Sequence, residues 1–345
     1  MSRINSMHRQ AGLTLVELMV ASTLSMVLLA GVLVLFSANK ATYRLQEGLS
    51  SIQDSGRYAV SQIKRDIEVA GFGGCITEDL IESNPKVIAK NPLPYIDDYQ
   101  IGIRVSGQND VSSVTIDGEN VSDGTDTLQI RGPLTGELFY TNGPTFPNNP
   151  VVVRGDASAL ASGEYVQITD CSGAEIFEIS GAVPFTTGSN TSSIPHGSSA
   201  NLPAQLSRRF GSDSVVMPLV TRTYFIGTSA GTNRTGGPVS ALFVSDGASP
   251  QEILQGVEDI QITYATDEDD DGRVDYVPAD SVTDWAAVLG VRISLLANSI
   301  EQSTQAPASY VYLPNGSTAI TPTDPNDRLM RQEFAIVATL RNNVK

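Results

Sequence analysis

The chain has 345 residues, and its 22 basic against 38 acidic side chains give a formal net charge of −16. Apolar residues make up 41% and charged residues 17%, so the chain can bury a core and is not disordered overall. An acidic chain lacks the basic face that neutralises phosphates, so nucleic acid is excluded from the expected partners. Two cysteines and two histidines exclude a disulfide-dense scaffold and a multi-cysteine zinc site, and they leave little room for histidine-dependent catalysis.

The first 36 residues are typical of a membrane anchor. Residues 1–12 carry Arg3 and Arg9 without an acid, and residues 13–36 contain one charge, Glu17. As a helix, the uncharged stretch 18–36 would span roughly 28 Å, the thickness of the hydrocarbon core. The alternative is a secretory signal peptide, but its apolar region is shorter and a cut after Ala38 would place the large Phe36 in the cleavage pocket. We therefore expect a retained single-pass helix with its N-terminus in the cytoplasm.

A carboxylate at the bilayer centre costs roughly 2.5–3.5 kcal/mol, so Glu17 is a candidate for a functional residue. The alternative is an interfacial residue without a role. The string Ala-Gly-Leu-Thr-Leu-Val-Glu at 11–17 resembles the type IV prepilin motif, in which Glu is the fifth residue after Gly. The resemblance implies that a prepilin peptidase cuts after Gly12 and methylates Leu13, which stands in place of the usual Phe. In a filament of staggered helices, Glu17 would meet the Leu13 amine of a neighbour and remove two costly charges from the apolar core.

The chain divides into a leader (1–12), a transmembrane half-helix (13–36), an amphipathic half-helix (37–70) and a β-rich head (71–345). Apolar residues at helical spacing predict the face that docks the head: Leu45, Leu49, Ile52, Ala59, Ile63 and Ile67. Gly48 and Gly56 weaken the helix and are expected to mark bends, and Gly71 ends it. The expected fold class is α+β and pilin-like, with the long helix packed on antiparallel sheets.

The head consists of short apolar or alternating runs between turn residues. The predicted strands are Ile101–Val105, Thr127–Ile130, Val151–Val153, Tyr165–Ile168, Val215–Val220, Thr223–Ile226, Ala241–Val244, Val291–Leu296 and Phe334–Leu340. Two polar stretches, Thr186–Ala200 and Gly227–Pro238, are predicted to be exposed loops. Because about 275 residues is large for one pilin head, we expect a second β-rich lobe.

Cys75 and Cys171 would both lie outside the cytoplasm, where disulfides persist. A bridge between them would join the end of the helix to the sheet, and the alternative is a pair of buried free thiols. Closing so long a loop could contribute as much as about 4.7 kcal/mol in the chain-entropy model.

An acidic run at 267–275 reproduces the ligand spacing of an EF-hand-type calcium loop. The carboxylates of Asp267, Asp269, Asp271 and Asp275 occupy positions 1, 3, 5 and 9, and Arg273 would supply its backbone carbonyl. The closing acid at position 12 is missing, because Pro278 stands there. Strand-like flanks predict a β-hairpin that could bind Ca²⁺, and the alternative is a solvated acidic turn.

The segments that flank this loop narrow the resemblance. Residues 71–75, 256–264, 284–285, 291–296 and 339–342 resemble the PilW family of minor type IV pilins. The resemblance implies a subunit that primes pilus assembly at or near the tip. Its implied partners are other minor pilins, the major pilin, the prepilin peptidase, a pilus-tip adhesin and, before assembly, inner-membrane lipid. The implied location is the bacterial inner membrane with the head in the periplasm, and then the pilus.

We expect no enzymatic activity. Gly71 to Gly74 lack the Gly-Lys-Ser/Thr of a phosphate loop, and His196 stands alone in a Ser/Thr-rich stretch, which makes a Ser–His–Asp triad improbable. Two alternatives stay open: a minor pseudopilin of a type II secretion system and, from another class, a membrane-anchored periplasmic hydrolase.

Overall fold

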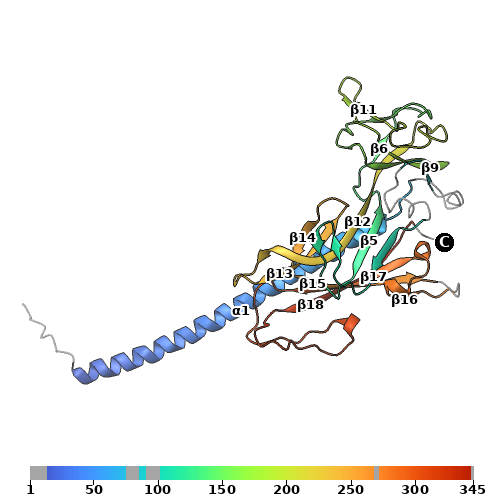
Figure 1. Ribbon diagram of the computed structural model, residues 1–345. Coiled ribbons are helices and arrows are strands. Elements are labelled where there is room, and N and C mark those ends of the chain that lie inside the picture. Colours follow the sequence, from blue (N-terminus) through green and yellow to red (C-terminus); the bar gives the residue numbers. More distant parts are fainter. Residues whose placement is uncertain (1–13, 75–84, 91–101, 268–271, 343–345) are drawn as a thin grey trace, which may run out of the picture.

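The computed structural model describes residues 14–74, 85–90, 102–267 and 272–342. One long helix, α1 (Leu15–Val69), projects from a β-rich head (Figure 1). At about 1.5 Å per residue, its 55 residues span about 82 Å. The α+β class predicted from the sequence, a long helix packed on antiparallel sheets, is confirmed.

Local signals set both ends of α1. Thr14 caps the first turn in a reciprocal pair with Glu17, and the chain then contains no proline before Pro85. After the capping residue Ala70, Gly71 adopts a φ of +66°, a left-handed conformation that glycine adopts without strain. The amide of Gly71 donates to the Arg131 carbonyl, so the chain passes directly from the helix into the head.

The head is built from strands and short 3₁₀ helices. The strands of the described residues are β1 (Lys86–Val87), β2 (Val105–Gln108), β3 (Thr115–Ile116), β4 (Glu119–Asn120), β5 (Thr127–Gly132), β6 (Phe139–Tyr140), β7 (Val151–Arg154), β8 (Tyr165–Asp170), β9 (Gly173–Glu178), β10 (Phe185–Thr186), β11 (Thr191–Ile194), β12 (Val215–Thr232), β13 (Pro238–Ser245), β14 (Gln251–Gln255), β15 (Val257–Thr266), β16 (Asp275–Val277), β17 (Gly290–Asn298) and β18 (Arg331–Thr339). The 3₁₀ helices are η2 (Ala279–Ser281), η3 (Trp285–Ala287) and η4 (Leu313–Asn315).

Two sheets carry most of the head. A nine-stranded sheet has the order β1-β9-β8-β12-β13-β14, with β2, β5 and β6 joined at its side, and a four-stranded sheet has the order β16-β15-β17-β18. Smaller sheets are β10-β11-β7 and β3-β4. The pair β1–β9 is parallel, whereas the longer ladders are antiparallel.

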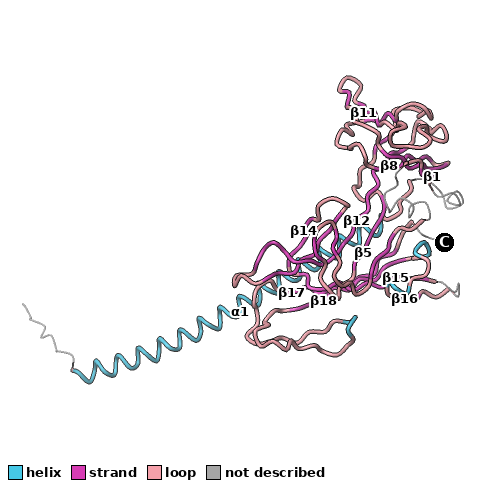
Figure 2. The backbone as a smooth tube through the Cα atoms, viewed as in Figure 1, coloured by secondary structure: helices cyan, strands magenta, loops and turns pink. Residues whose placement is uncertain are grey.

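Within the described residues, the buried apolar side chains form two large clusters and two smaller ones. The proximal lobe (102–134 and 220–342) shares its core with α1, and the distal lobe (85–90 and 135–219) has its own core around Phe177, Phe210 and Val216. The strand β12 runs through both, because its first residues pair with β6 and β8 and its later residues with β5 and β13 (Figure 2). The distal lobe therefore lies at the opposite end of the molecule from the start of α1 (Figure 1).

The face of α1 that docks on the head is shorter than the sequence predicted. Its buried residues are Gly48, Ile52, Gly56, Ala59, Val60, Ile63, Asp66 and Ile67. Leu45 and Leu49 have the spacing of this stripe but are exposed: Leu45 precedes the first buried residue, Gly48, and Leu49 stays 36% exposed although it follows Gly48. Gly48 and Gly56, expected to mark bends, are positions where the head packs closely against the helix. A Cβ on Gly56 would lie 2.2 Å from the Phe334 ring of β18, and one on Gly48 would lie 2.5 Å from Ser303 Oγ.

Several strand and loop predictions need correction. The two runs at 215–226 form one strand, β12, and the predicted loop Gly227–Pro238 is mostly strand, since β12 ends at Thr232 and β13 begins at Pro238. The predicted loop Thr186–Ala200 contains β11, whose Ile194 is fully buried. Ile101 lies outside the described residues, and the predicted strand there begins only at Val105. In each case long-range pairing overrides a local polar composition.

Asp126 joins the two large sheets just before β5. Its amide donates to the Ile260 carbonyl, and its Oδ2 accepts from the Ile262 amide of β15 at 2.6 Å. Its Oδ1 accepts from the Asp110 amide at 2.9 Å. Burial raises the pKa of this carboxyl to about 6, in spite of the two amide donors.

We predict that Gly56→Leu destabilises the head by about 1–3 kcal/mol, because the new side chain must displace the Phe334 ring between α1 and β18. Chemical denaturation of the full chain in detergent measures the change. Tyr58→Leu, at an exposed position two residues along, is the matched control and should stay within about 0.5 kcal/mol of the parent. Equal stability of the two variants would show that the helix does not dock closely at Gly56.

Candidate functional site

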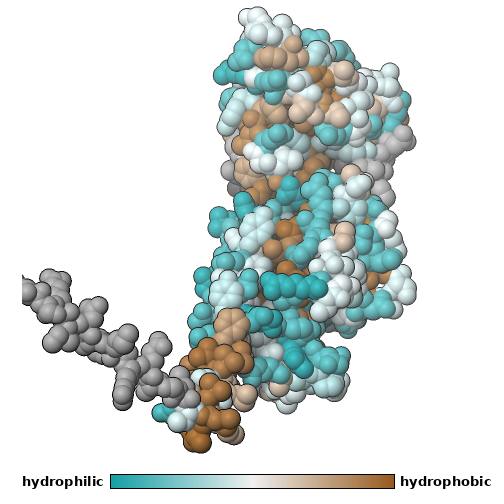
Figure 3. Space-filling model, turned by 90° about the vertical axis from the view of Figure 1, so that its left-hand side faces the viewer, coloured by the Kyte–Doolittle hydropathy of each residue, from teal (hydrophilic) through white to brown (hydrophobic). Residues whose placement is uncertain are grey.

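The N-terminal half of α1 is an uncovered apolar surface. From Leu15 to Phe36 its large apolar side chains are exposed, and the helix is long and apolar enough to cross a membrane. Figure 3 shows this surface as a continuous hydrophobic segment beside a mostly hydrophilic head. Such a surface requires a lipid or protein environment that excludes water.

Glu17 lies at the start of this surface and caps the helix. Its Oε2 accepts from the Thr14 amide and from Thr14 Oγ1, both at 3.0 Å, while its own amide donates to Thr14 Oγ1 at 3.3 Å. A carboxylate is favourable at this end, because the first turn of a helix leaves amide groups without partners. Gly12 and Leu13, the predicted processing residues, lie outside the described residues.

The other half of α1 is fixed to the head by a buried ionic group. Asp66 is only 4% exposed, and its Oδ2 accepts from Arg222 Nη1 at 2.9 Å and from Tyr224 Oη at 2.6 Å. Both partners lie on β12. Burial, reinforced by the neighbouring Asp66 carboxylate, raises the pKa of Tyr224, so its hydroxyl stays a hydrogen-bond donor.

The C-terminal segment returns to the same end of the helix. Asn342 Nδ2 donates to the Ala70 carbonyl at 3.0 Å, which satisfies one of the carbonyls that a helix end leaves free. Arg341 pairs with Glu68 at 3.2 Å. The helix end is therefore bound both by β12 and by the residues that follow β18.

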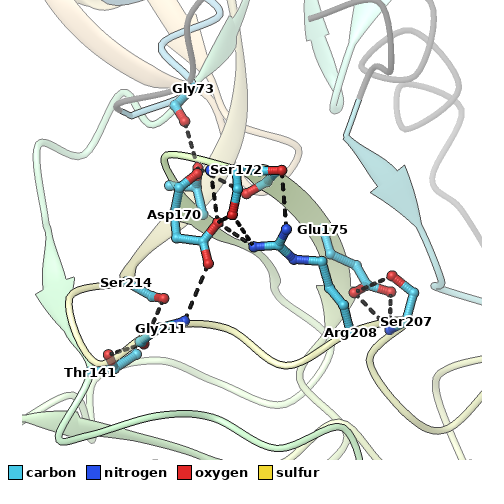
Figure 4. A network of polar contacts seen from close by, with 11 residues as sticks. Gly73, Thr141, Asp170, Ser172, Glu175, Ser207, Arg208, Gly211 and Ser214 are labelled. Carbon is cyan, nitrogen blue, oxygen red and sulfur yellow. Dashed lines mark hydrogen bonds and ion pairs between the residues drawn. The ribbon is translucent and has the colours of Figure 1, made fainter. Parts of the chain in front are cut away.

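A polar network attaches the distal lobe to the segment after the helix (Figure 4). Thr169 Oγ1 donates to the Gly73 carbonyl at 2.9 Å. The next residue, Asp170, accepts from the amides of Ser172 and Gly211 and forms an ion pair with Arg208. Burial opposes the charged form, but the hydrogen bonds from Ser172 and Gly211 together with Arg208 lower the pKa of Asp170.

Cys171 follows this network and is disulfide-bonded. Its expected partner, Cys75, lies outside the described residues, so the pairing of these two residues stays a prediction. A bridge at this point would reinforce the contact of Thr169 with Gly73, because both tie the segment after α1 to β8.

The acidic run lies at the turn of the predicted β-hairpin. The strands β15 and β16 pair antiparallel, with Thr266 opposite Asp275. Asp267 Oδ1 is buried and has no hydrogen-bond partner within the described part of the chain. Asp269 and Asp271 lie outside the described residues. Among the described residues, no group of three or more His, Cys, Asp or Glu side chains could hold a metal ion. Arg273 and Asp275 are exposed, and calcium binding stays a prediction.

Sequence reasoning missed Asp66 and the burial of His196. Asp66 follows Ile63 by three residues, so a carboxylate on the apolar stripe was the signal that could have revealed a buried ion pair. His196 is 5% exposed, although its polar surroundings predicted an exposed loop. Nothing in the local sequence indicates that burial, because it depends on residues of the distal lobe far away along the chain.

Comparison with known families gives two matches. Residues 223–342 match the model of type IV pilus-assembly protein W, and residues 7–33 match the prokaryotic N-terminal methylation motif. The first range contains β13 to β18 and part of β12, and the second contains Gly12, Leu13 and Glu17. Both families are pilus structural or assembly proteins. The distal lobe lies outside both ranges, and the comparison with curated proteins gives no match.

We predict that Asp66→Asn lowers the stability of the full chain by about 1.5–3 kcal/mol, since it removes a charged acceptor from the buried Tyr224 hydroxyl and the half-buried Arg222 guanidinium. Asp54→Asn, at an exposed position of the same helix, is the control and should change stability by less than about 0.5 kcal/mol. In a double-mutant cycle, Asp66→Asn should cost less once Arg222 has been replaced by Met. Additive losses would mean that the pair contributes no coupling.

For the acidic hairpin, the melting temperature of the full chain should rise with millimolar calcium and fall with a chelator, because calcium would bind only the folded turn. Extracellular sites of this kind bind with Kd of roughly 10⁻⁴–10⁻³ M, and magnesium should do less. Asp269→Ala with Asp271→Ala should abolish the response, whereas Asp54→Ala with Asp213→Ala should retain it. A melting temperature that ignores both calcium and chelator would identify a simple acidic turn.

Proposed function

Because the chain is a type IV pilin-like protein of the PilW family, we propose that it is a minor pilin that primes pilus assembly and sits at or near the pilus tip. The observation that carries this proposal is the division of α1 into two halves. The first half exposes apolar side chains to whatever surrounds it, and the second half is buried against the head.

The uncovered half fits two environments in turn. Before assembly it would cross the inner membrane, with the head in the periplasm. After a prepilin peptidase has cut after Gly12 and methylated Leu13, the same surface would pack against the helices of other minor pilins and of the major pilin. Moving from lipid to a helix bundle keeps the apolar surface out of water, so the transfer costs little free energy.

The proposed role of Glu17 follows from its place in the first turn. Glu17 follows Leu13 by four residues along the chain, about one helical turn, so its carboxylate would meet the new amine of Leu13 or that of a neighbour. In an apolar filament core two such charges are tolerated only as a pair. Glu17 would therefore select the register in which the subunit enters the filament.

The distal lobe supports a place at the tip. It lies at the end of the head farthest from the start of α1, and its core is independent of the helix (Figure 1). In a filament with its helices along the axis, that end points away from the membrane. A terminal subunit has no head stacked above it, so an added lobe is accommodated there and is free to contact a tip adhesin.

The alternatives make different demands. A minor pseudopilin of a type II secretion system would share the helix and its processing, but its loss would stop protein secretion and leave pili intact. A membrane-anchored periplasmic hydrolase would need a catalytic constellation in the head. The proposal is of a non-catalytic filament component.

We predict that Glu17→Ala leaves membrane insertion intact but reduces the amount of the protein in sheared pili several-fold. Glu47→Ala is the matched control, because Glu47 is exposed on the same helix beyond the apolar half. Quantitative immunoblots of membrane and pilus fractions measure both. Incorporation of Glu17→Ala at the level of Glu47→Ala would contradict an assembly role for this carboxylate.

For the tip, deletion of the chain should reduce the number of pili per cell, and gold-labelled antibody against the head should mark one end of sheared pili. Labels spread along the filament would contradict the tip location. Intact piliation with lost secretion would favour the pseudopilin.

A further inference from the structure

His196 is a buried histidine in the distal lobe, two residues after β11. It is 5% exposed, and its ring forms a T-shaped contact with the ring of Phe177 of β9, with centroids 5.5 Å apart. Its only counterpart in the chain is His8. The fold and the proposed pilus function leave this ring without a role.

Both ring nitrogens of His196 face backbone carbonyls. Nδ1 lies 2.9 Å from the Ala204 oxygen, and Nε2 lies 2.7 Å from the Asn149 oxygen. A carbonyl oxygen can only accept, so each nitrogen must donate for both hydrogen bonds to exist. A neutral imidazole carries one N–H, whereas the imidazolium carries two. The geometry therefore fits the charged ring.

One buried carboxylate interacts electrostatically with this ring, although burial raises its pKa and so opposes its charged form. Glu175 of β9 is fully buried, accepts from the amide and hydroxyl of Ser207, and interacts electrostatically with His196. Lys86 of β1 also acts on Glu175. The other cations near these loops have partners of their own: Lys90 donates to the Ser198 carbonyl, Arg208 pairs with Asp170, and Arg209 lies over the Phe146 ring.

The two carbonyls belong to different surface loops. Asn149 ends a turn in which its amide donates to the Phe146 carbonyl, and Ala204 lies in the segment that leads to Leu206. The amide of Leu206 donates to the Pro147 carbonyl, so these loops touch at a second point. The first loop presents Phe146, whose ring is 48% exposed.

We propose that His196 is a proton-operated clamp between the 145–149 and 201–206 loops of the distal lobe, and that it makes both of its hydrogen bonds only when both ring nitrogens carry protons. Histidine is the side chain that changes charge between pH 5 and 8. On loss of one proton, a lone pair faces a carbonyl oxygen and that hydrogen bond becomes a repulsion. The two loops then keep the Leu206–Pro147 hydrogen bond but lose one of the bonds through the ring, and the order of the surface around Phe146 therefore depends on pH. This inference does not require the proposed pilus function.

The full chain, labelled with ¹³C and ¹⁵N at histidine and held in detergent, tests the clamp directly. His8→Gln leaves one histidine signal, that of His196. Nitrogen shifts should show both ring nitrogens protonated at pH 5.5 and one at pH 8. As the pH rises from 5.5 to 8, the protection of the Leu206 and Asn149 amides against hydrogen exchange, corrected for the intrinsic effect of pH, should fall about tenfold. That change is equivalent to the loss of about one hydrogen bond.

Two variants separate this effect from other titrations. His196→Gln should remove the pH dependence of exchange at Leu206, whereas Asp126→Asn, at the carboxyl whose pKa is about 6 in the proximal lobe, should leave it in place. The proposal is overturned if the ring of the parent protein stays singly protonated at pH 5.5. It is also overturned if the ring titrates while the exchange at Leu206 and Asn149 does not change.

Discussion

The docking of α1 on the four-stranded sheet is the constraint on which the rest of the structure depends. The helix is about 82 Å long, and only the part from Gly48 onward is covered by the head. Two glycines allow close approach to β18 and to Ser303, and the Asp66 group holds the helix end against β12. The same helix therefore exposes apolar side chains in its first half and contributes buried side chains to the core of the head in its second half. Because α1 is continuous from Leu15 to Val69, its uncovered half is joined to the docked half without a break in the helix.

The strand β12 connects the part of the head that docks on α1 to the distal lobe. It begins between β6 and β8, passes beside Asp66 through Arg222 and Tyr224, and ends in the hairpin with β13. The hydrogen bonds from Thr169 and Gln167 to the Gly73 carbonyl attach the distal lobe a second time, at the segment that follows the helix. The lobe that lies outside both family matches is thus held at two points, by β12 and by the contact with Gly73. Its surface loops can vary, or respond to protons as we infer for His196, without disturbing the docked helix.

Much of this architecture could be predicted from the sequence, and the failures have physical causes. The apolar run, the absence of proline and Gly71 located the helix to within two residues, since these signals are local. The turn residues also located the hairpin around the acidic run. Leu45 and Leu49 have the right spacing to be buried, but periodicity cannot tell where a head ends. The partners of Asp66 lie 156 and 158 residues away, and His196 is buried by loops of the distal lobe, so neither environment has a local signature.

The central claim is that α1 begins at a processed terminus and serves as the assembly segment of a pilus subunit. Mass spectrometry of the N-terminal peptide, from protein recovered in sheared pili, tests that claim most directly. The account predicts a peptide that begins at an N-methylated Leu13, with residues 1–12 absent. An intact terminus that still carries Arg3 and Arg9, or a chain that begins after Ala38 without the apolar half of the helix, would contradict it.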